Sequence, residues 1–236
     1  MVHTPRTASS PAQLIKHGKK WTNRFRAYHR RTREKGLGHA RGQAGSAERL
    51  ARLGHGKCVY CESALEVTDY FEVEHYVAKS VAPDLAFEWT NFLPACRRCN
   101  NAKGEQDHRD ALLKPDDEDP EPYFWIHPDT GKLEPHPKLD ETQAHRARET
   151  IRLCDLQRKQ LCEKRYETLK RAGRWLLQVS DAGRPDDALR EEWDALSSPR
   201  MEYKLVLRHV LETRGQHELA EFDRARFRSI VVQSGS

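Results

Sequence analysis

The sequence has no long apolar run, no apolar leader and few cysteines. No stretch approaches the roughly 18 consecutive apolar residues that span a bilayer, which excludes an integral membrane protein with helical spans and makes a membrane partner unexpected. Residues 1–5 do not open the apolar region of a secretory signal, so we expect a cytoplasmic protein. The six cysteines are then expected to be thiols or metal ligands rather than disulfides.

Acidic residues are scarce in residues 1–57, where Glu34 and Glu48 stand against fourteen Lys and Arg. This segment has a net charge of +12, whereas the rest of the chain holds 27 basic and 34 acidic side chains, a net charge of −7. A strongly basic segment beside an acidic body is expected of a protein that meets a polyanion. The 5 Trp, 7 Tyr and 7 Phe are too many for a disordered chain.

Local patterns in the first half predict short elements. Residues 12–35 are basic, with apolar side chains at helical spacing, and predict an amphipathic helix with a cationic face. A short helix is expected to begin at Ser46, a candidate N-cap. Residues 66–76 are rich in β-forming side chains and predict a strand, and residues 89–94 predict a second strand or a turn. Residues 100–113 predict a helix that ends before a proline.

The second half predicts a hairpin followed by helices. Residues 123–133 place an Asp- and Gly-containing turn between apolar runs, which indicates a β-hairpin. From Asp140 onward the spacing is helical, as in a bundle. Trp175 and Trp193 are expected in its core, with docking of a partner as the alternative. One stripe follows the i, i+3, i+4, i+7, i+8 pattern without error: Tyr203, Val206, Leu207, Val210 and Leu211.

Four of the cysteines form two pairs with metal-ligand spacing. Each pair places two thiolates on a tight turn, and two such turns complete a tetrahedral zinc site. The 34 residues between the pairs exceed the roughly 15–20 of a common zinc ribbon, so a substantial insertion is expected there. Cys154 and Cys162 lack matching partners and are expected to be small buried residues. The paired cysteines are Cys58-x-x-Cys61 and Cys96-x-x-Cys99.

The insertion and the second pair together resemble a known family. The residues that carry the resemblance are Cys58-x-x-Cys61, Glu74-His75, Asn91-Phe92-Leu93 and Cys96-Arg97-Arg98-Cys99-Asn100-Asn101-Ala102-Lys103. In this order they resemble the HNH endonucleases with zinc knuckles. The resemblance implies a ββα-metal site, in which a hairpin carries the acid–His pair and the following helix carries a third residue.

The resemblance also implies roles for individual residues. His75 corresponds to the general base that takes a proton from water. Glu74 and Asn100 correspond to the ligands of a catalytic divalent ion, and Asn91 to the residue that braces the loop between strand and helix. Asn100 stands where the family often has His. An amide oxygen there favours a hard ion, so the expected cofactors are structural Zn²⁺ and catalytic Mg²⁺ or Mn²⁺.

These roles agree with the chemistry of phosphodiester cleavage. A His with a pKa near neutrality can act as the base, and a divalent ion can neutralise charge on the phosphoryl oxygens. Neighbouring residues on a strand point to opposite faces, so Glu74 and His75 can serve different tasks. Basic residues around the motif are candidates for phosphate contacts, and Lys103 is the strongest of them. The other candidates are Lys79, Arg97 and Arg98.

A finer resemblance extends over most of residues 45–170. Its added motifs are Cys58-Val59-Tyr60-Cys61-Glu62, Val73-Glu74-His75-Tyr76 with Lys79, Phe87-x-x-x-Asn91-Phe92-Leu93, Leu112-Leu113-Lys114-Pro115 and Thr150-Ile151-x-Leu153. They resemble the HNH subunit of the Septu-type and retron-associated antiphage defence systems. The resemblance implies a bacterial defence nuclease that acts on nucleic acid with a partner ATPase of the ABC/SMC-like kind. It leaves the choice between DNA and RNA open, and DNA is the favoured expectation.

The expected fold class is α+β, with a small zinc-stapled ββα-metal core embedded in a mainly α-helical chain. The alternative function is a zinc-stabilised module that binds nucleic acid or docks a partner without cleaving. The chain is divided into a basic helical segment, the HNH core, an acidic Pro-rich linker with a hairpin, and a helical domain. These segments are 1–57, 58–114, 115–139 and 140–236.

Overall fold

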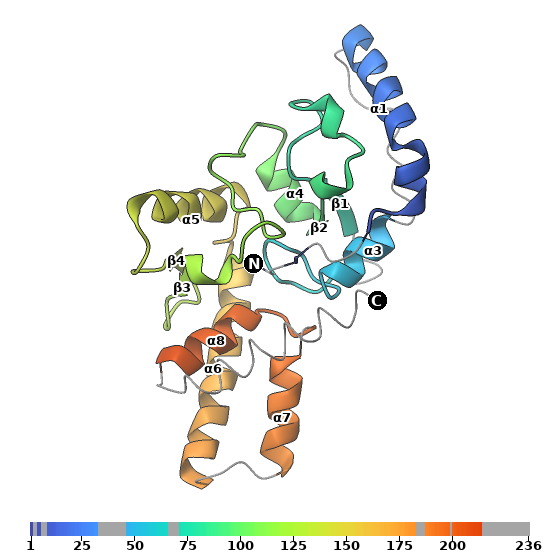
Figure 1. Ribbon diagram of the computed structural model, residues 1–236. Helices are drawn as coiled ribbons and strands as arrows, with labels where there is room; N and C mark the ends of the chain where they lie inside the picture. Colours follow the sequence, from blue (N-terminus) through green and yellow to red (C-terminus); the bar gives the residue numbers. More distant parts are fainter. Residues whose placement is uncertain are drawn as a thin grey trace.

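Helices make up most of the structure, and two small antiparallel sheets complete an α+β fold (Figure 1). The computed structural model describes residues 1, 4–5, 9–32, 46–65, 71–182, 187–198 and 200–213. Among the described helices, none combines the length and apolar character that a bilayer crossing requires.

The first sheet and the helix after it form a ββα unit around the cysteines. Strand β1 (Phe71–His75) pairs antiparallel with β2 (Phe92–Cys96), and α4 (Arg97–Lys103) begins directly after β2. Two short 3₁₀ turns, η1 (Pro83–Leu85) and η2 (Trp89–Asn91), lie in the loop between the strands. This confirms the second half of the strand predicted at 66–76, while residues 66–70 lie outside the described chain.

The helix predicted at 100–113 was wrong in both bounds. Helix α4 begins at Arg97, because β2 ends at the preceding residue and the chain turns there. It ends at Lys103, because Gly104 adopts a φ of 70°, a left-handed conformation that glycine tolerates and that stops a helix. Residues 105–112 continue as turns and bends.

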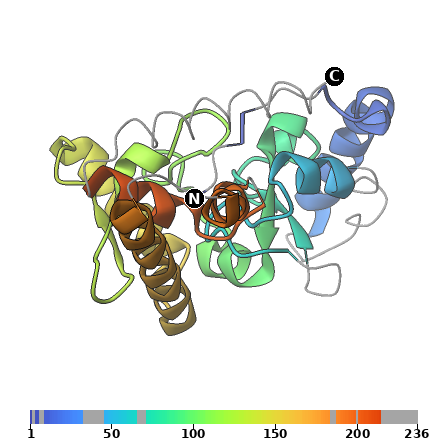
Figure 2. The same ribbon diagram turned by 90° about the horizontal axis from the view of Figure 1, so that it is seen from below.

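Two N-terminal helices pack against the ββα unit. Helix α1 (Ala12–Thr32) and α3 (Ser46–Leu53) confirm both predictions, apart from residues 33–35, which lie outside the described chain. A small buried cluster joins them to the sheet and its loop through Leu14, Leu50, Trp89 and Phe92. In Figure 2 helix α1 lies at the right-hand edge of the molecule, and the orange and red C-terminal helices lie from the centre to the left.

The predicted hairpin is confirmed. It follows η3 (Glu121–Tyr123) and consists of β3 (Phe124–Ile126) and β4 (Leu133–Pro135). Gly131 in its turn has a φ of 65°, and a Cβ there would lie 2.1 Å from the Cys162 carbonyl oxygen. A glycine is therefore required where the turn packs on the following helix.

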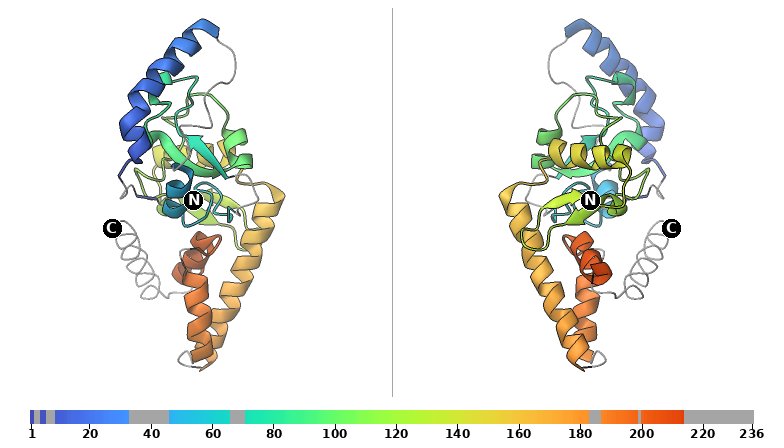
Figure 3. Two further views of the ribbon diagram at one scale, coloured as in Figure 1. Left: turned by 90° about the vertical axis from the view of Figure 1, so that its right-hand side faces the viewer. Right: turned by 90° about the vertical axis from the view of Figure 1, so that its left-hand side faces the viewer.

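The rest of the described chain is helical, as predicted. Helix α5 (Glu141–Leu153) begins at a capping box formed by Asp140 and Gln143. It is followed by α6 (Lys159–Ala182), α7 (Asp187–Ser197) and α8 (Lys204–Thr213). Helices α6 and α7 project from the body as a two-helix arm (Figure 3). Trp175 and Trp193 are buried inside this arm, 4.6 Å apart between ring centroids, so packing explains them.

The main core joins the cysteine region to the helical half. One buried cluster includes Tyr60 beside the first cysteine pair, Leu113 after α4, Leu156 between α5 and α6, and Val206 on α8. The ββα unit is too small to bury a large core alone, and the helices supply the missing apolar surface.

Candidate functional site

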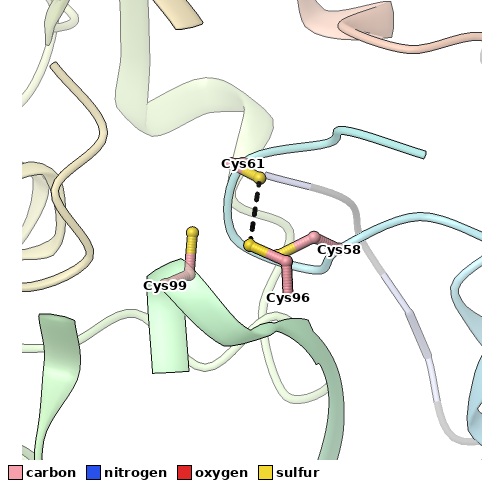
Figure 4. Close-up of side chains that lie close together, drawn as sticks. All are labelled: Cys58, Cys61, Cys96 and Cys99. Atoms are coloured by element: carbon pink, nitrogen blue, oxygen red, sulfur yellow. Dashed lines mark hydrogen bonds between the residues drawn. The ribbon is translucent and has the colours of Figure 1, made fainter. Parts of the chain in front are cut away.

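The four paired cysteines converge on one point (Figure 4). Their sulfur atoms all lie within 4.8 Å of one another, and three of the four side chains are buried. The first pair lies on a tight turn in which the Glu62 N–H donates to the Cys58 carbonyl at 3.0 Å. The second pair lies at the junction of β2 and α4. Residues far apart in the sequence thus form one compact sulfur cluster.

The cluster has the dimensions of a tetrahedral metal site. Metal–sulfur bonds of about 2.3 Å place tetrahedral sulfurs roughly 3.8 Å apart, and the Sγ atoms of Cys61 and Cys96 are 3.9 Å apart. Burial raises the pKa of the Cys58 thiol. Hydrogen bonds with the other three cysteines lower the pKa of the Cys61 thiol. A metal ion such as zinc would hold all four as thiolates. The residues therefore fit such an ion.

Arg158 faces this cluster from the helical half. Its Nη1 atom lies 3.6 Å from the Cys99 sulfur and donates to the Asp155 carbonyl at 2.9 Å. Four thiolates around a divalent ion carry a net charge of −2, and a nearby guanidinium offsets part of it. Cys154 and Cys162 are buried and do not join the cluster, as expected.

His75 closes β1 and is held by the loop between the strands. Its Nε2 atom lies 3.0 Å from the Ala86 carbonyl oxygen, and its ring packs edge-on against Phe92 at 4.9 Å. A carbonyl oxygen can only accept, so Nε2 must carry the proton. In the neutral ring Nδ1 then bears the lone pair, which is the tautomer that a base acting through Nδ1 requires.

Asn91 fastens the loop that carries Ala86. Its amide nitrogen donates to the carbonyl oxygens of Val77 and Leu85 at 2.9 and 3.1 Å. Its amide oxygen accepts from the Val77 N–H at 2.8 Å. The two bonds to Val77 are buried and join the two ends of the loop, and the partly buried bond to Leu85 fixes its middle, which is the geometry of a bracing residue.

Glu74 points to the other face of β1 and is buried with Lys103. The carboxylate lies 2.6 Å from the Lys103 ammonium, and the Tyr60 hydroxyl donates to it at 3.5 Å. Burial raises the pKa of Glu74 to about 7, although Lys103 acts in the opposite direction. The ammonium also donates to the carbonyl oxygens of His75 and Tyr76. All three N–H donors of Lys103 thus face protein oxygens, which places Lys103 in the interior rather than at a phosphate.

Asn100 meets a different carboxylate from the one expected. Its amide nitrogen lies 2.5 Å from Oε2 of Glu72, and both side chains are partly exposed. The structure therefore brings Asn100 to Glu72 and not to Glu74. Sequence reasoning missed Glu72, although the period of two along a strand places residues 72 and 74 on the same face. Of the other candidates for phosphate contact, Arg97 and Arg98 are exposed on α4.

Comparison with known proteins agrees with this geometry. Residues 58–106 match the HNH endonuclease family. The chain is 43% identical over 68 residues to the Septu protein PtuB of Bacillus thuringiensis, which covers 28% of this chain and 26% of that protein. It is 29% identical over 152 residues to the Septu protein PtuB of Bacillus mycoides (strain KBAB4), which covers 51% of this chain and 50% of that protein.

The matched segment coincides with the structural unit. It begins at the first cysteine of the sulfur cluster and ends just beyond α4, so it contains both strands, His75 and Asn91. The chain spans about a quarter of one relative's length and half of the other's. Residues 58–106 of this chain match the HNH endonuclease family, and parts of the chain are similar to two proteins named Septu protein PtuB.

Proposed function

We propose that this protein is a metal-dependent HNH endonuclease that hydrolyses phosphodiester bonds as the effector nuclease of a bacterial antiphage defence system. The observation that carries the proposal is His75 at the end of β1, with its Nε2 proton directed to the Ala86 carbonyl. The match of residues 58–106 to the HNH endonuclease family supports this role.

His75 acts as the general base in this proposal. Nδ1 accepts a proton from the water whose oxygen attacks the phosphorus, and the Ala86 carbonyl stabilises the imidazolium through the Nε2–H. The phosphorus–oxygen bond to the leaving sugar oxygen breaks, and that oxygen takes a proton from solvent water. Asn91 keeps Ala86 in place by fastening the loop at Val77 and Leu85. The base is thus oriented before the substrate arrives, which lowers the cost of reaching the transition state.

Two different ions serve the domain. The four cysteines would hold a structural zinc ion, and Asn100 with a carboxylate of β1 would hold a Mg²⁺ or Mn²⁺ ion. Glu74 is the carboxylate that the resemblance implies, and Glu72 is the one that contacts Asn100. The divalent ion supplies Lewis-acid stabilisation of charge on the phosphoryl group. Oxygen ligands of this type suit a hard cation.

The biological setting is the one that the Septu-type resemblance implies, and the names of the two similar proteins support it. Both bear the name Septu protein PtuB, and we extend the defence role to this chain. The substrate is nucleic acid, with DNA favoured over RNA, and the partner is an ATPase of the ABC/SMC-like kind in the cytoplasm. Within the chain, 58–114 is the cutting unit, 1–57 the basic segment, 115–139 the linker and 140–236 the helical domain.

The proposal is tested by cleavage of plasmid DNA and of a long RNA with Mg²⁺ or Mn²⁺, by the full chain alone and with its co-purifying partner. His75→Ala should lower the cleavage rate by about 10²–10⁴-fold, the usual effect of losing a general base. His145→Ala, at an exposed position of α5, is the matched control and should cut like the wild type. Equal rates for wild type and His75→Ala would refute the proposal.

A further inference from the structure

One face of helix α1 packs against the HNH domain. Trp21 and Phe25 pack on Phe87 with ring centroids 5.7 and 6.4 Å apart. A Cβ on Gly18 would lie 3.7 Å from the Phe87 carbonyl oxygen, so helix backbone and loop backbone approach closely here. Arg26 adds an ion pair with Asp84 of η1 at 2.6 Å. These contacts fix α1 on the loop between β1 and β2.

The opposite face of α1 is cationic. Lys16, Lys19 and Lys20 are exposed there, on the side of the helix away from Trp21 and Phe25, and Arg24 is exposed at the edge of this face. The whole helix contains seven Lys or Arg and no acidic residue: Lys16, Lys19, Lys20, Arg24, Arg26, Arg30 and Arg31. A solvated helix face usually mixes both signs of charge, whereas a face of one sign attracts a polyanion.

The cationic face and His75 are positioned by contacts with the same loop. The loop that α1 covers contains Asp84 and Phe87, and Ala86, which directly precedes Phe87, accepts the hydrogen bond from His75. The cationic face and the proposed base are therefore held by the same short segment of chain. A nucleic acid lying along α1 would be kept at a fixed distance from His75.

We infer that the exposed face of α1 formed by Lys16, Lys19, Lys20 and Arg24 binds the phosphate backbone of a nucleic acid and holds the strand beside the HNH domain. This inference rests on the proposed function, because it names a second contact of the same substrate. Lys16 and Arg24 are about 12 Å apart along the helix axis. A strand of a B-form duplex advances about 3.4 Å per phosphate, so the face spans about three phosphates. Contacts of this kind carry no sequence preference.

Binding of a mixed-sequence DNA duplex tests the inference without any cleavage. The full chain carrying His75→Ala is titrated against a fluorescent duplex at salt concentrations from 50 to 200 mM. Lys16→Ala, Lys20→Ala and Arg24→Ala are combined in one variant, since alanine preserves the helix. The slope of the logarithm of the association constant against the logarithm of the salt concentration should become shallower by about 2.7, or about 0.9 for each lost phosphate contact. Over this fourfold range of salt, the variant should lose about 40-fold less affinity than its parent.

A second triple variant supplies the control. Lys164→Ala, Lys170→Ala and Arg174→Ala remove the same charge from exposed positions of α6. This variant should keep the parental slope. Equal slopes for the α1 variant and its parent would overturn the inference and leave an acidic protein as the ligand of α1. An equal decrease of the slope in both triple variants would overturn it too, because net charge alone would then explain binding. Since no step requires cutting, the outcome is independent of whether the chain proves to be a nuclease.

Discussion

At the scale of single residues, Lys103 determines how β1 and α4 meet. Its ammonium pairs with Glu74 and also donates to the His75 and Tyr76 carbonyl oxygens. A buried ammonium needs a counter-charge and hydrogen bonds on every donor, and here it has both. The two acidic residues on this strand face therefore have different partners. Glu74 pairs with the buried Lys103, and Glu72 contacts Asn100.

This difference in partners predicts that Glu74→Gln lowers stability, whereas Glu72→Gln weakens metal binding. Glu74→Gln leaves the Lys103 ammonium buried without a counter-charge and should lower the free energy of unfolding by about 3–5 kcal/mol. Glu72→Gln should leave the free energy of unfolding nearly unchanged, because Glu72 is partly exposed. It should instead weaken Mn²⁺ binding at least about tenfold, since a carboxylate ligand is lost.

Denaturant unfolding and Mn²⁺ titration followed by electron paramagnetic resonance measure the two effects separately, on the zinc-loaded protein. The reverse pattern, weak Mn²⁺ binding in Glu74→Gln and wild-type binding in Glu72→Gln, would show that the acid next to the His is the ligand.

At the scale of elements, sequence patterns predicted what depends on neighbours in the chain. The apolar stripe of α8 and the turn of the β3–β4 hairpin are local signals, and both elements are present. The order of cysteines, His75 and Asn91 likewise predicted an HNH domain. The carboxylate that faces Asn100 could not be predicted, because Glu72 and Glu74 share a strand face. Which one meets Asn100 depends on where Lys103 lies, and that contact forms only when α4 packs on β1.

The loop between β1 and β2 is the element whose shape matters most for His75. Asn91→Ala removes two buried hydrogen bonds and one partly buried one, and leaves Val77 and Leu85 backbone groups without that partner. We expect the free energy of unfolding to fall by about 2–4 kcal/mol, because unsatisfied buried groups cost about 1–3 kcal/mol each and part of the loss is relieved by water. Thr90→Ala, at the exposed neighbouring position, is the control. Identical denaturation midpoints for Asn91→Ala and Thr90→Ala would contradict the bracing role.

At the scale of the whole molecule, the sulfur cluster joins the HNH domain to the helical half. The turn of the first cysteine pair is contacted by the segment before α8: Lys57 donates to the Met201 carbonyl at 2.9 Å, and the Ser63 and Tyr203 hydroxyls are 3.0 Å apart. Arg158, just before α6, faces Cys99 of the second pair. Both turns are therefore in contact with the C-terminal helices, so a metal ion that fixes the turns also fixes these helices.

Removal of the metal should therefore loosen the helical half as well as the turns. After chelation, backbone amides of α8 and of the first turns of α6 should exchange hydrogen at least about tenfold faster, as metal binding and folding are coupled. The far end of the α6–α7 arm should change less, because the arm projects from the body of the molecule (Figure 3). Hydrogen–deuterium exchange by mass spectrometry measures both regions, and added zinc should restore the protection. Cys96→Ser should reproduce the chelated state, whereas Cys162→Ser, outside the cluster, should retain one zinc per chain. Unchanged protection of α8 in a zinc-free chain would show that the apolar core alone holds the two halves together.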